Sequence, residues 1–187
     1  RNSRDENKKI KNGVIPEEWE KPENKSKLAQ KDTDADWTKK NGERHFGYKD
    51  HVKCDADSKL ITNYSVTSAS VHDSQRCLVF IGQEDEVLYA DSAYSGKPIA
   101  LALPENCKNQ ICEKGYRNSP LTSEQKMNNR RKSRIRCRIE HIFGFMTGAM
   151  HGITIRSIGI TRAWMNIGIT NLVYNFCRYS YLKRASA

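Results

Sequence analysis

The sequence predicts a mixed α/β or α+β protein, and three observations lead to that prediction. Apolar and polar residues alternate between 44 and 67, as they do in half-buried strands. The short apolar run at 87–90 is typical of a strand buried on both faces. Apolar residues further along recur at helical spacing. At 187 residues the chain is long enough for one domain, with sheet packed against helices.

The first part of the chain is polar. Residues 1–41 are rich in Lys, Glu, Asn and Asp and poor in aliphatic residues, so they can bury little surface by themselves. We expect them to form a partly ordered arm or insertion, with Trp19 and Trp37 as anchors. Residues 42–187 are expected to form the folded domain.

A hairpin is predicted next. The apolar side chains of its first strand are all at even positions: Phe46, Tyr48, Val52 and Cys54. The turn-like segment 55–58 follows, and 60–67 reads as the return strand. Asp73 is in place to N-cap a short helix that runs to about Ile81.

Two longer helices are predicted in the second half. Thr122 and Gln125 fit a capping box at the start of the first. Its apolar residues continue at helical spacing through Ile135, Ile139, Ile142, Phe143 and Met146. The second helix covers about 162–182, and its apolar stripe comprises Met165, Ile169, Leu172, Phe176 and Tyr179.

Charge and cysteine content narrow the function classes. The net charge of +10 favours a polyanionic partner, although a solvated basic surface is the alternative. No apolar run reaches the roughly 20 residues that a membrane span needs. The six cysteines form no CxxC pair, so we expect free thiols, a reducing cytoplasm and no zinc site.

Two acidic residues stand in settings that suggest a metal site. Asp91 follows the apolar run at 87–90, and Glu140 lies in a strongly basic stretch. Carboxylates at such positions can hold the Mg²⁺ ions that phosphoryl transfer to or from nucleic acid requires. Each has a structural alternative: Asp91 could cap the turn at 92–96, and Glu140 could pair with Arg136, four residues earlier.

Several motifs in order resemble the catalytic core of bacterial insertion-sequence transposases, in particular the insertion-sequence-five-like group of the larger four-like superfamily. They are DTDADWTKKNG (32–42), FGYKDHV (46–52), YADSAYSG (89–96), EKGYRN (113–118), RxxxE at Arg136 and Glu140, and IGITNLVYNFCRY (167–179). The resemblance covers nearly the whole chain. It implies an RNase H-like, retroviral-integrase-like fold, a mixed sheet with flanking helices.

The resemblance also implies the chemistry. Asp91 would be the second Asp and Glu140 the final Glu of a DDE triad, both holding Mg²⁺ or Mn²⁺, and Arg136 matches the family's conserved-motif Arg. Such enzymes cleave and transfer strands of double-stranded DNA at transposon ends and target sites, and are expected to act as homo-oligomers in the bacterial cytoplasm or nucleoid. DNA phosphate contacts are expected from Arg130, Arg131, Lys132, Arg134 and Arg138.

The chain departs from the family pattern at three points. The family signature's Tyr and Lys would fall at Ser133 and Thr147. The strand with the first Asp would precede Arg1, so we expect that strand to be missing and the site to be crippled for strand transfer. Asp34 is the substitute to consider. The alternative function is a non-catalytic, basic DNA-binding remnant.

Overall fold

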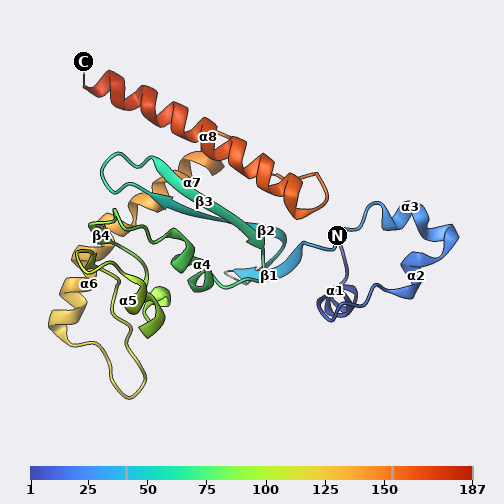
Figure 1. Cartoon of the computed structure of the whole chain (residues 1–187), viewed down its shortest axis with the longest axis horizontal. Coiled ribbons are helices and arrows are strands. Elements are labelled where there is room, and N and C mark those ends of the chain that lie inside the picture. Colours follow the sequence, from blue (N-terminus) through green and yellow to red (C-terminus); the bar gives the residue numbers. More distant parts are fainter. Residues whose placement is uncertain (41, 153, 187) are drawn as a thin grey trace. The chain divides into compact units, whose positions relative to one another are not determined.

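The computed structural model describes residues 1–40, 42–152 and 154–186 (Figure 1). Its helices and strands form a mixed α/β structure with sheet and flanking helices, which confirms the predicted class at that level. Two compact units divide the chain. The first comprises Arg1–Asp50, Ser65–Val71 and Thr154–Ile169, and the second comprises His51–Tyr64, His72–Ile153 and Thr170–Ala187.

The larger sheet contains the predicted hairpin. Its strands are β1 (Asp36–Lys40), β2 (Glu43–Cys54) and β3 (Ile61–Ser68), in that order across the sheet. β1 pairs antiparallel with β2, with Trp37 opposite Phe46. The turn after β2 is closed by the Asp55 N–H, which donates to the Leu60 carbonyl at 2.9 Å. The hairpin prediction is therefore confirmed.

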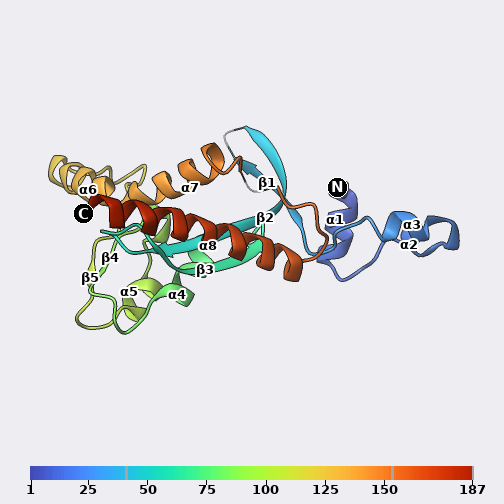
Figure 2. The ribbon, with the colours of Figure 1, turned by 90° about the horizontal axis from the view of Figure 1, so that it is seen from above.

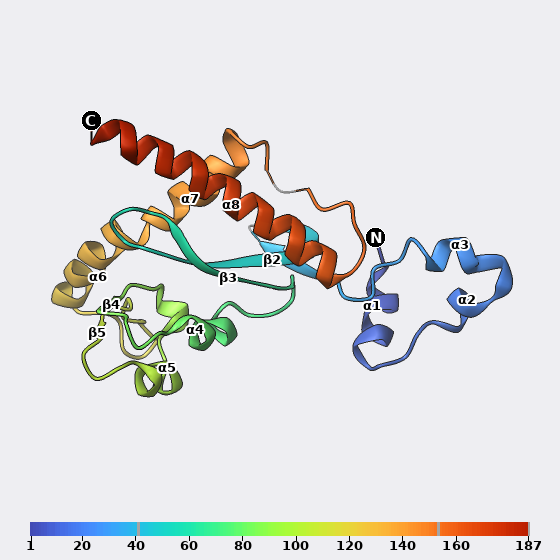
Figure 3. The same cartoon turned by 45° about the horizontal axis from the view of Figure 1, so that its top comes forward.

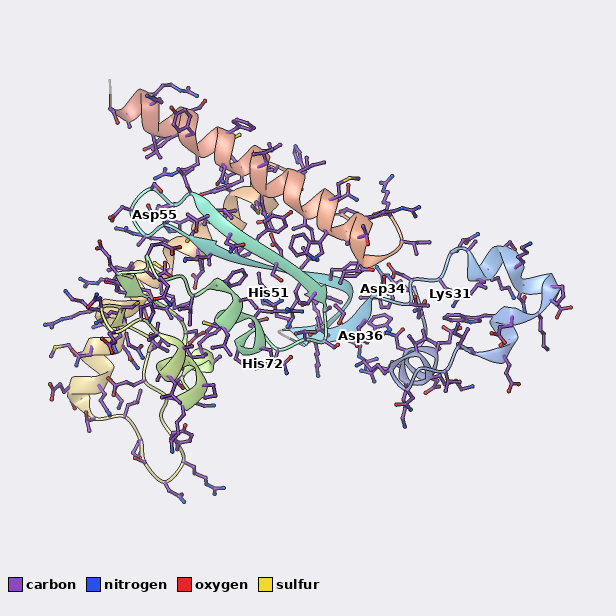
Figure 4. The ribbon with its side chains drawn as sticks, viewed as in Figure 1. Lys31, Asp34, Asp36, His51, Asp55 and His72 are labelled. Atoms are coloured by element: carbon purple, nitrogen blue, oxygen red, sulfur yellow. The ribbon has the colours of Figure 1, made fainter. Side chains whose placement is uncertain are left out.

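The N-terminal arm is held in the first unit by a charged cluster around Trp19. The arm comprises α1 (Arg4–Lys11), α2 (Glu17–Glu20), the 3-10 helix η1 (Pro22–Asn24) and α3 (Lys25–Leu28). Trp19 is buried, and its indole N–H donates to Glu6 at 2.9 Å. Lys31 forms an ion pair with the same carboxylate at 3.0 Å and lies over the Trp19 ring (Figure 4). One carboxylate thus joins α1 to two later segments.

This cluster predicts a pH-dependent stability. Burial alone would raise the pKa of Glu6, but hydrogen bonds from the Ser3 N–H, Lys31 and Trp19 lower it from about 4.5 to about 2. A carboxyl whose folded pKa is depressed stabilises the protein above its unfolded pKa and loses that contribution as pH falls through its folded pKa. We expect Glu6→Gln to lower the free energy of unfolding by a constant amount above pH 5.

Denaturant titrations of the wild type and Glu6→Gln at several pH values measure this effect. The difference in unfolding free energy should shrink between about pH 4.5 and pH 2. Asp5→Asn is the matched control, since Asp5 is an exposed acid in the same helical turn. A Glu6→Gln difference that stays unchanged from pH 6 to pH 2.5 contradicts the assignment.

The second unit packs around two apolar clusters. Its elements are α4 (Ser74–Phe80), β4 (Val87–Leu88), the 3-10 helix η2 (Ser92–Tyr94), α5 (Lys97–Ala102), β5 (Lys108–Asn109), α6 (Ser123–Arg136) and α7 (Arg138–Gly148). One cluster places Cys77, Ile99 and Ile111 against the segment that leads to η2. The other places Ile142 and Met146 of α7 against Ile61 and Tyr174. α7 is thereby fixed to the hairpin.

The last helix, α8 (Ile160–Ala185), lies along β3. In the first unit the Trp164 indole N–H donates to the Val66 carbonyl at 3.2 Å. In the second unit the Asn175 side chain bonds both the N–H and the carbonyl of Ile61 at 2.8 Å. Figures 2 and 3 show the ribbon of α8 running beside β3. The predicted helix is confirmed and extended by a few residues at each end.

The predicted apolar stripe of α8 faces solvent, although an apolar stripe of a surface helix ordinarily packs against the core. The side chains of α8 that are buried include Ala163, Ile167, Asn171 and Tyr174. The residues named from the sequence instead are the exposed ones: Met165, Ile169, Leu172, Phe176 and Tyr179 are 53–64% exposed. The helix is apolar on two opposite sides, and the sequence alone does not say which side is buried.

Candidate active site

Asp91 lies directly after a short parallel ladder. β4 pairs with β5, and the backbone bonds continue from the Gln110 N–H to Leu88 and from the Cys112 N–H to Ala90, at 2.9 and 3.0 Å. Ala90 also packs against the cluster of Cys77, Ile99 and Ile111. Backbone hydrogen bonds to residues 108–112 and the packing of Ala90 therefore hold the segment that leads to Asp91.

The strand differs from its prediction in burial. The sequence predicted a strand at 87–90 buried on both faces, but β4 spans only Val87–Leu88 and Val87 is 38% exposed. The continuous apolar run was therefore misinterpreted. Leu88 and Ala90 pack against the cluster, whereas Val87, which points to the opposite face of the strand, is exposed.

The Asp91 carboxylate caps the turn and is still accessible. Its Oδ1 accepts from the Ser92 N–H at 2.5 Å, which makes Asp91 the N-cap of η2. The Asp91 side chain is exposed, and within the described residues its Oδ2 has no hydrogen-bonding partner. The capping alternative is thus observed, and within the described residues it engages only one of the two carboxylate oxygens.

Glu140 lies just after a break between two helices. The sequence predicted one helix through this region, but α6 ends at Arg136 and α7 begins at Arg138. At the break the Cys137 thiol lies 3.2 Å from the Arg134 carbonyl, the group that would accept the Arg138 N–H in a continuous helix. The Glu140 N–H then bonds the Cys137 carbonyl at 3.0 Å, three residues back instead of four.

Arg136 pairs with Glu140 across this break. Arg136 Nη2 is 3.1 Å from Glu140 Oε1, the i,i+4 geometry that the sequence predicted. The Glu140 side chain is 61% exposed, so the pair adds little to stability, about 0.5 kcal/mol or less. Its main consequence is orientational, because Arg136 fixes one carboxylate oxygen and leaves Oε2 without a partner in the described part of the chain.

The five basic residues expected to contact DNA fall into two groups. Lys132 donates to the Ile111 carbonyl at 3.0 Å, and Arg138 bonds the Ala56 carbonyl and pairs with Asp57 at 3.2 Å. Both are therefore engaged within the chain. Arg130, Arg131 and Arg134 are exposed on α6 and have no ion-pair partner among the described residues. Of the five, these three therefore present a charge to solvent that no ion pair within the described residues neutralises.

An open pocket of about 400 Å³ adjoins α6. Tyr89, Gln110, Asn128, Arg131, Lys132 and Ile135 line it. Tyr89 is two residues before Asp91, so the pocket shares the β4 segment with the candidate carboxylate. Its lining combines apolar, polar and cationic side chains.

A buried histidine beside Asp73 was missed by the sequence reasoning. His51 lies on β2, and its Nδ1 is 3.8 Å from Asp73 Oδ1 (Figure 4). Burial first, and then the negative charges of Asp73, Cys77 and Asp91, raise the pKa of Tyr94 to about 12. Asp73 and Asp91 therefore both act on the Tyr94 hydroxyl. The residues predicted to face inward are at even positions of this strand, and His51 is at an odd one. The alternation of apolar and polar residues therefore did not predict its burial.

Asp73 occupies the predicted N-cap position of α4 without capping it through its side chain. Its backbone is already helical, with φ −59° and ψ −36°, whereas a capping residue is ordinarily extended. The Ser74 N–H bonds His72 Nδ1 instead, at 3.3 Å. The Asp73 carboxylate is thereby available to face His51.

The three upstream acids have structural partners in the first unit. Asp34 Oδ2 accepts the Ile160 N–H at 2.9 Å, and Asp32 Oδ2 accepts the Gly159 N–H at 3.2 Å, at the start of α8 (Figure 4). Burial alone would raise the pKa of Asp36, but hydrogen bonds led by that from Lys11 lower it. These contacts give the acids defined structural roles, and they do not favour Asp34 as a substitute metal ligand.

The described residues contain no preformed group of three or more His, Cys, Asp or Glu side chains that could hold a metal ion. Asp91 and Glu140 both belong to the second unit, and each has one oxygen free of other partners. All six cysteines are free, as expected. In the described part of the chain, no helix is both long and apolar enough to cross a membrane.

Comparison with known proteins gives the class to which this chain belongs. The family model for the transposase DDE domain matches residues 17–176, and this chain belongs to that family. The predicted resemblance is therefore confirmed.

Comparison with one curated relative shows what share of a transposase's length this chain matches. The chain is 33% identical over 117 residues to the transposase for insertion sequence element IS1106 of Neisseria meningitidis serogroup B. The match covers 61% of this chain and 40% of that relative, so the chain spans well under two thirds of its length. No solved structure matches the chain.

Proposed function

We propose that this chain is part of the catalytic domain of a bacterial insertion-sequence transposase, with an RNase H-like fold. The whole enzyme would cleave DNA and transfer its strands, whereas this chain is expected to be crippled for strand transfer. The observation that carries the proposal is the family match, because it runs from residue 17 to 176 and so includes both Asp91 and Glu140. Whole transposases of this kind would act on transposon ends and target DNA in the bacterial cytoplasm, at the nucleoid.

Asp91 and Glu140 are proposed as the metal ligands. Each presents one carboxylate oxygen without another partner among the described residues, and hard oxygen ligands suit Mg²⁺ or Mn²⁺. When bound, such an ion neutralises phosphate charge and makes a coordinated water more acidic. Arg136 is a positioning residue in this proposal, since it holds Glu140 Oε1 and so orients the other oxygen.

The exposed arginines of α6 are proposed to position the duplex. Arg130, Arg131 and Arg134 can contact phosphates, which gives affinity without sequence specificity. Lys132 and Arg138 are better described as holding α6 and α7 to neighbouring segments, because each bonds a backbone carbonyl. Their contribution to DNA binding would be indirect.

The function is tested by incubating the chain with duplex DNA that carries the element's terminal repeat. We expect nicking that requires Mg²⁺ or Mn²⁺ and stops with EDTA. We also expect it to be slow, because two carboxylates hold the ion less firmly than three. The expected binding weakens steeply with salt. Cleavage that persists in EDTA would contradict the proposed chemistry.

A second candidate is a DNA-binding domain that does not cut. The observation in its favour is that the described residues hold no group of three metal-ligating side chains. It predicts salt-sensitive DNA binding that is unchanged by EDTA and by Asp91→Asn, with no nicking in either metal. Binding without nicking would therefore select this candidate over the transposase reaction.

A further inference from the structure

The open pocket beside α6 is lined by polar side chains that have no protein partner. Its volume is about 400 Å³, which is within the range of small-ligand sites. Four of the side chains that line it form no hydrogen bond or ion pair with another described residue: Tyr89, Gln110, Asn128 and Arg131. The first three are half-buried. A few polar groups that converge on a pocket in this way are what fixes the orientation of a ligand.

Neighbouring polar residues of α6 are engaged within the chain. The Asn129 carboxamide bonds both the N–H and the carbonyl of Glu113 at 2.9 Å. Lys132 donates to the Ile111 carbonyl at 3.0 Å. All of these residues, and all that line the pocket, belong to the second unit. The bonds hold α6 against the chain that follows β5, and the carboxamide of Asn128, one residue before Asn129, remains free at the pocket.

The pocket lies on the same side of the β4 segment as Asp91. Side chains of an extended segment alternate between its two faces. Leu88 and Ala90 pack against the apolar cluster of this unit. Tyr89, which lines the pocket, and Asp91 therefore share the opposite face. Two residues span about 7 Å along a strand, so a group held at Tyr89 is a near neighbour of a group held at Asp91.

The chemistry of the lining matches a nucleotide. Tyr89 offers an aromatic ring, on which any nucleobase can stack. The carboxamides of Gln110 and Asn128 each present a hydrogen-bond donor beside an acceptor, the arrangement that pairs with an edge of adenine. The Arg131 guanidinium can bond the attached phosphate. A base inside a duplex is covered on both faces by its neighbours, so the ring can stack only on an unpaired base.

We propose that this pocket binds one unpaired nucleobase of the DNA, next to the phosphate that lies at Asp91. The base stacks on Tyr89, and Gln110 and Asn128 read its edge. The inference rests on the proposed function, because that function brings a DNA strand to Asp91. It adds a place where sequence is read, whereas the exposed arginines of α6 contact phosphates and carry no sequence information.

Two DNA duplexes that differ at a single unpaired terminal residue test the proposal. One ends in an unpaired adenine nucleotide and the other in an abasic nucleotide, so both carry the same number of phosphates and the same electrostatic attraction. Binding to the whole chain is measured by fluorescence anisotropy in EDTA, which prevents metal-dependent cleavage. The wild type is expected to bind the adenine duplex at least about fivefold more tightly, because its base stacks in the pocket.

Substitutions in the pocket locate this preference. Tyr89→Ala is expected to abolish it and Tyr89→Phe to keep it, since a phenyl ring still stacks. Asn128→Ala is expected to weaken binding of the adenine duplex and to leave binding of the abasic duplex unchanged, because alanine suits a helix. Asn106→Ala is the matched control and should change neither, since Asn106 is an exposed carboxamide of the same unit outside the pocket.

Failure of the pocket and failure of the proposed function give different results. Equal binding of the two duplexes by the wild type would overturn the pocket and leave the proposed function standing. The same holds if Tyr89→Ala keeps the full preference, or if Asn128→Ala binds both duplexes as the wild type does. Binding of neither duplex, even at low salt, would overturn the proposed function, and the pocket would fall with it.

Discussion

Replacing Asp91 by Asn is expected to lower the affinity of the chain for Mn²⁺ at least about tenfold, since losing even an indirect ligand contact costs that much at many metal sites. Asn keeps the size and the capping oxygen, so the bond from the Ser92 N–H to residue 91 can persist. The loss would therefore report on the negative charge at Oδ2 and not on the fold. Titration calorimetry with Mn²⁺ measures it.

Replacing Glu140 should also weaken Mn²⁺ binding, whereas replacing an acid outside the site should not. Glu140→Gln is expected to weaken Mn²⁺ binding by a similar factor, and the double variant by less than the product, because the two side chains would serve one ion. Glu105→Gln is the control, since Glu105 is an exposed acid in the same unit. Equal Mn²⁺ affinity in the wild type and Asp91→Asn would remove Asp91 from the site.

Replacing Ile142 by Ala is expected to lower the free energy of unfolding by about 2–4 kcal/mol. Ile142 is fully buried and packs with Met146 of the same helix, Ile61 of β3 and Tyr174 of α8, so truncation leaves a cavity that two other elements border. α7, which carries Glu140, is fixed to the hairpin by these contacts. Denaturant titration monitored by circular dichroism gives the change.

Ile15→Ala is the matched control for that measurement. It makes the same substitution at an isoleucine that is 48% exposed, so its effect should stay within about 0.5 kcal/mol. If Ile142→Ala were no more costly than Ile15→Ala, then α7 would not be packed as described. The placement of Glu140 would then lose its support.

Local interactions were the part of the fold that could be predicted. The capping box of Thr122 and Gln125 is present in full, because both partners lie within one helical turn. The hairpin was predictable for a similar reason: alternation marks its strands, and the turn between them is closed by residues six or fewer positions apart. Such features depend on neighbours that the sequence shows directly.

The helix break at Cys137 and the burial of α8 could not be predicted. The apolar residues keep their helical spacing through the break, so their periodicity carries no information about it. α8 has apolar residues on opposite sides, so either could have faced β3. Packing against Ile61 and Val66 decides it, through contacts about 100 residues apart in sequence.

The candidate site was predictable in its residues but not in its surroundings. Motif order identified Asp91, Arg136 and Glu140, and the Arg136–Glu140 pair is formed. The partners of Lys132 and Arg138 lie 21 and 81–82 residues away, so the sequence could not separate these two from the solvent-exposed arginines. The same distance problem hid the contact between His51 and Asp73.

The central claim is that Asp91 and Glu140 hold one divalent ion, and iron-mediated cleavage of the polypeptide tests it most directly. Fe²⁺ bound in place of Mg²⁺, with ascorbate and peroxide, generates radicals that cut the backbone close to the ion. The proposal predicts two cuts, one near residue 91 and one near residue 140, both suppressed by excess Mg²⁺ and both lost in Asp91→Asn. A cut at only one of these positions, or cuts that survive in Asp91→Asn, would contradict it.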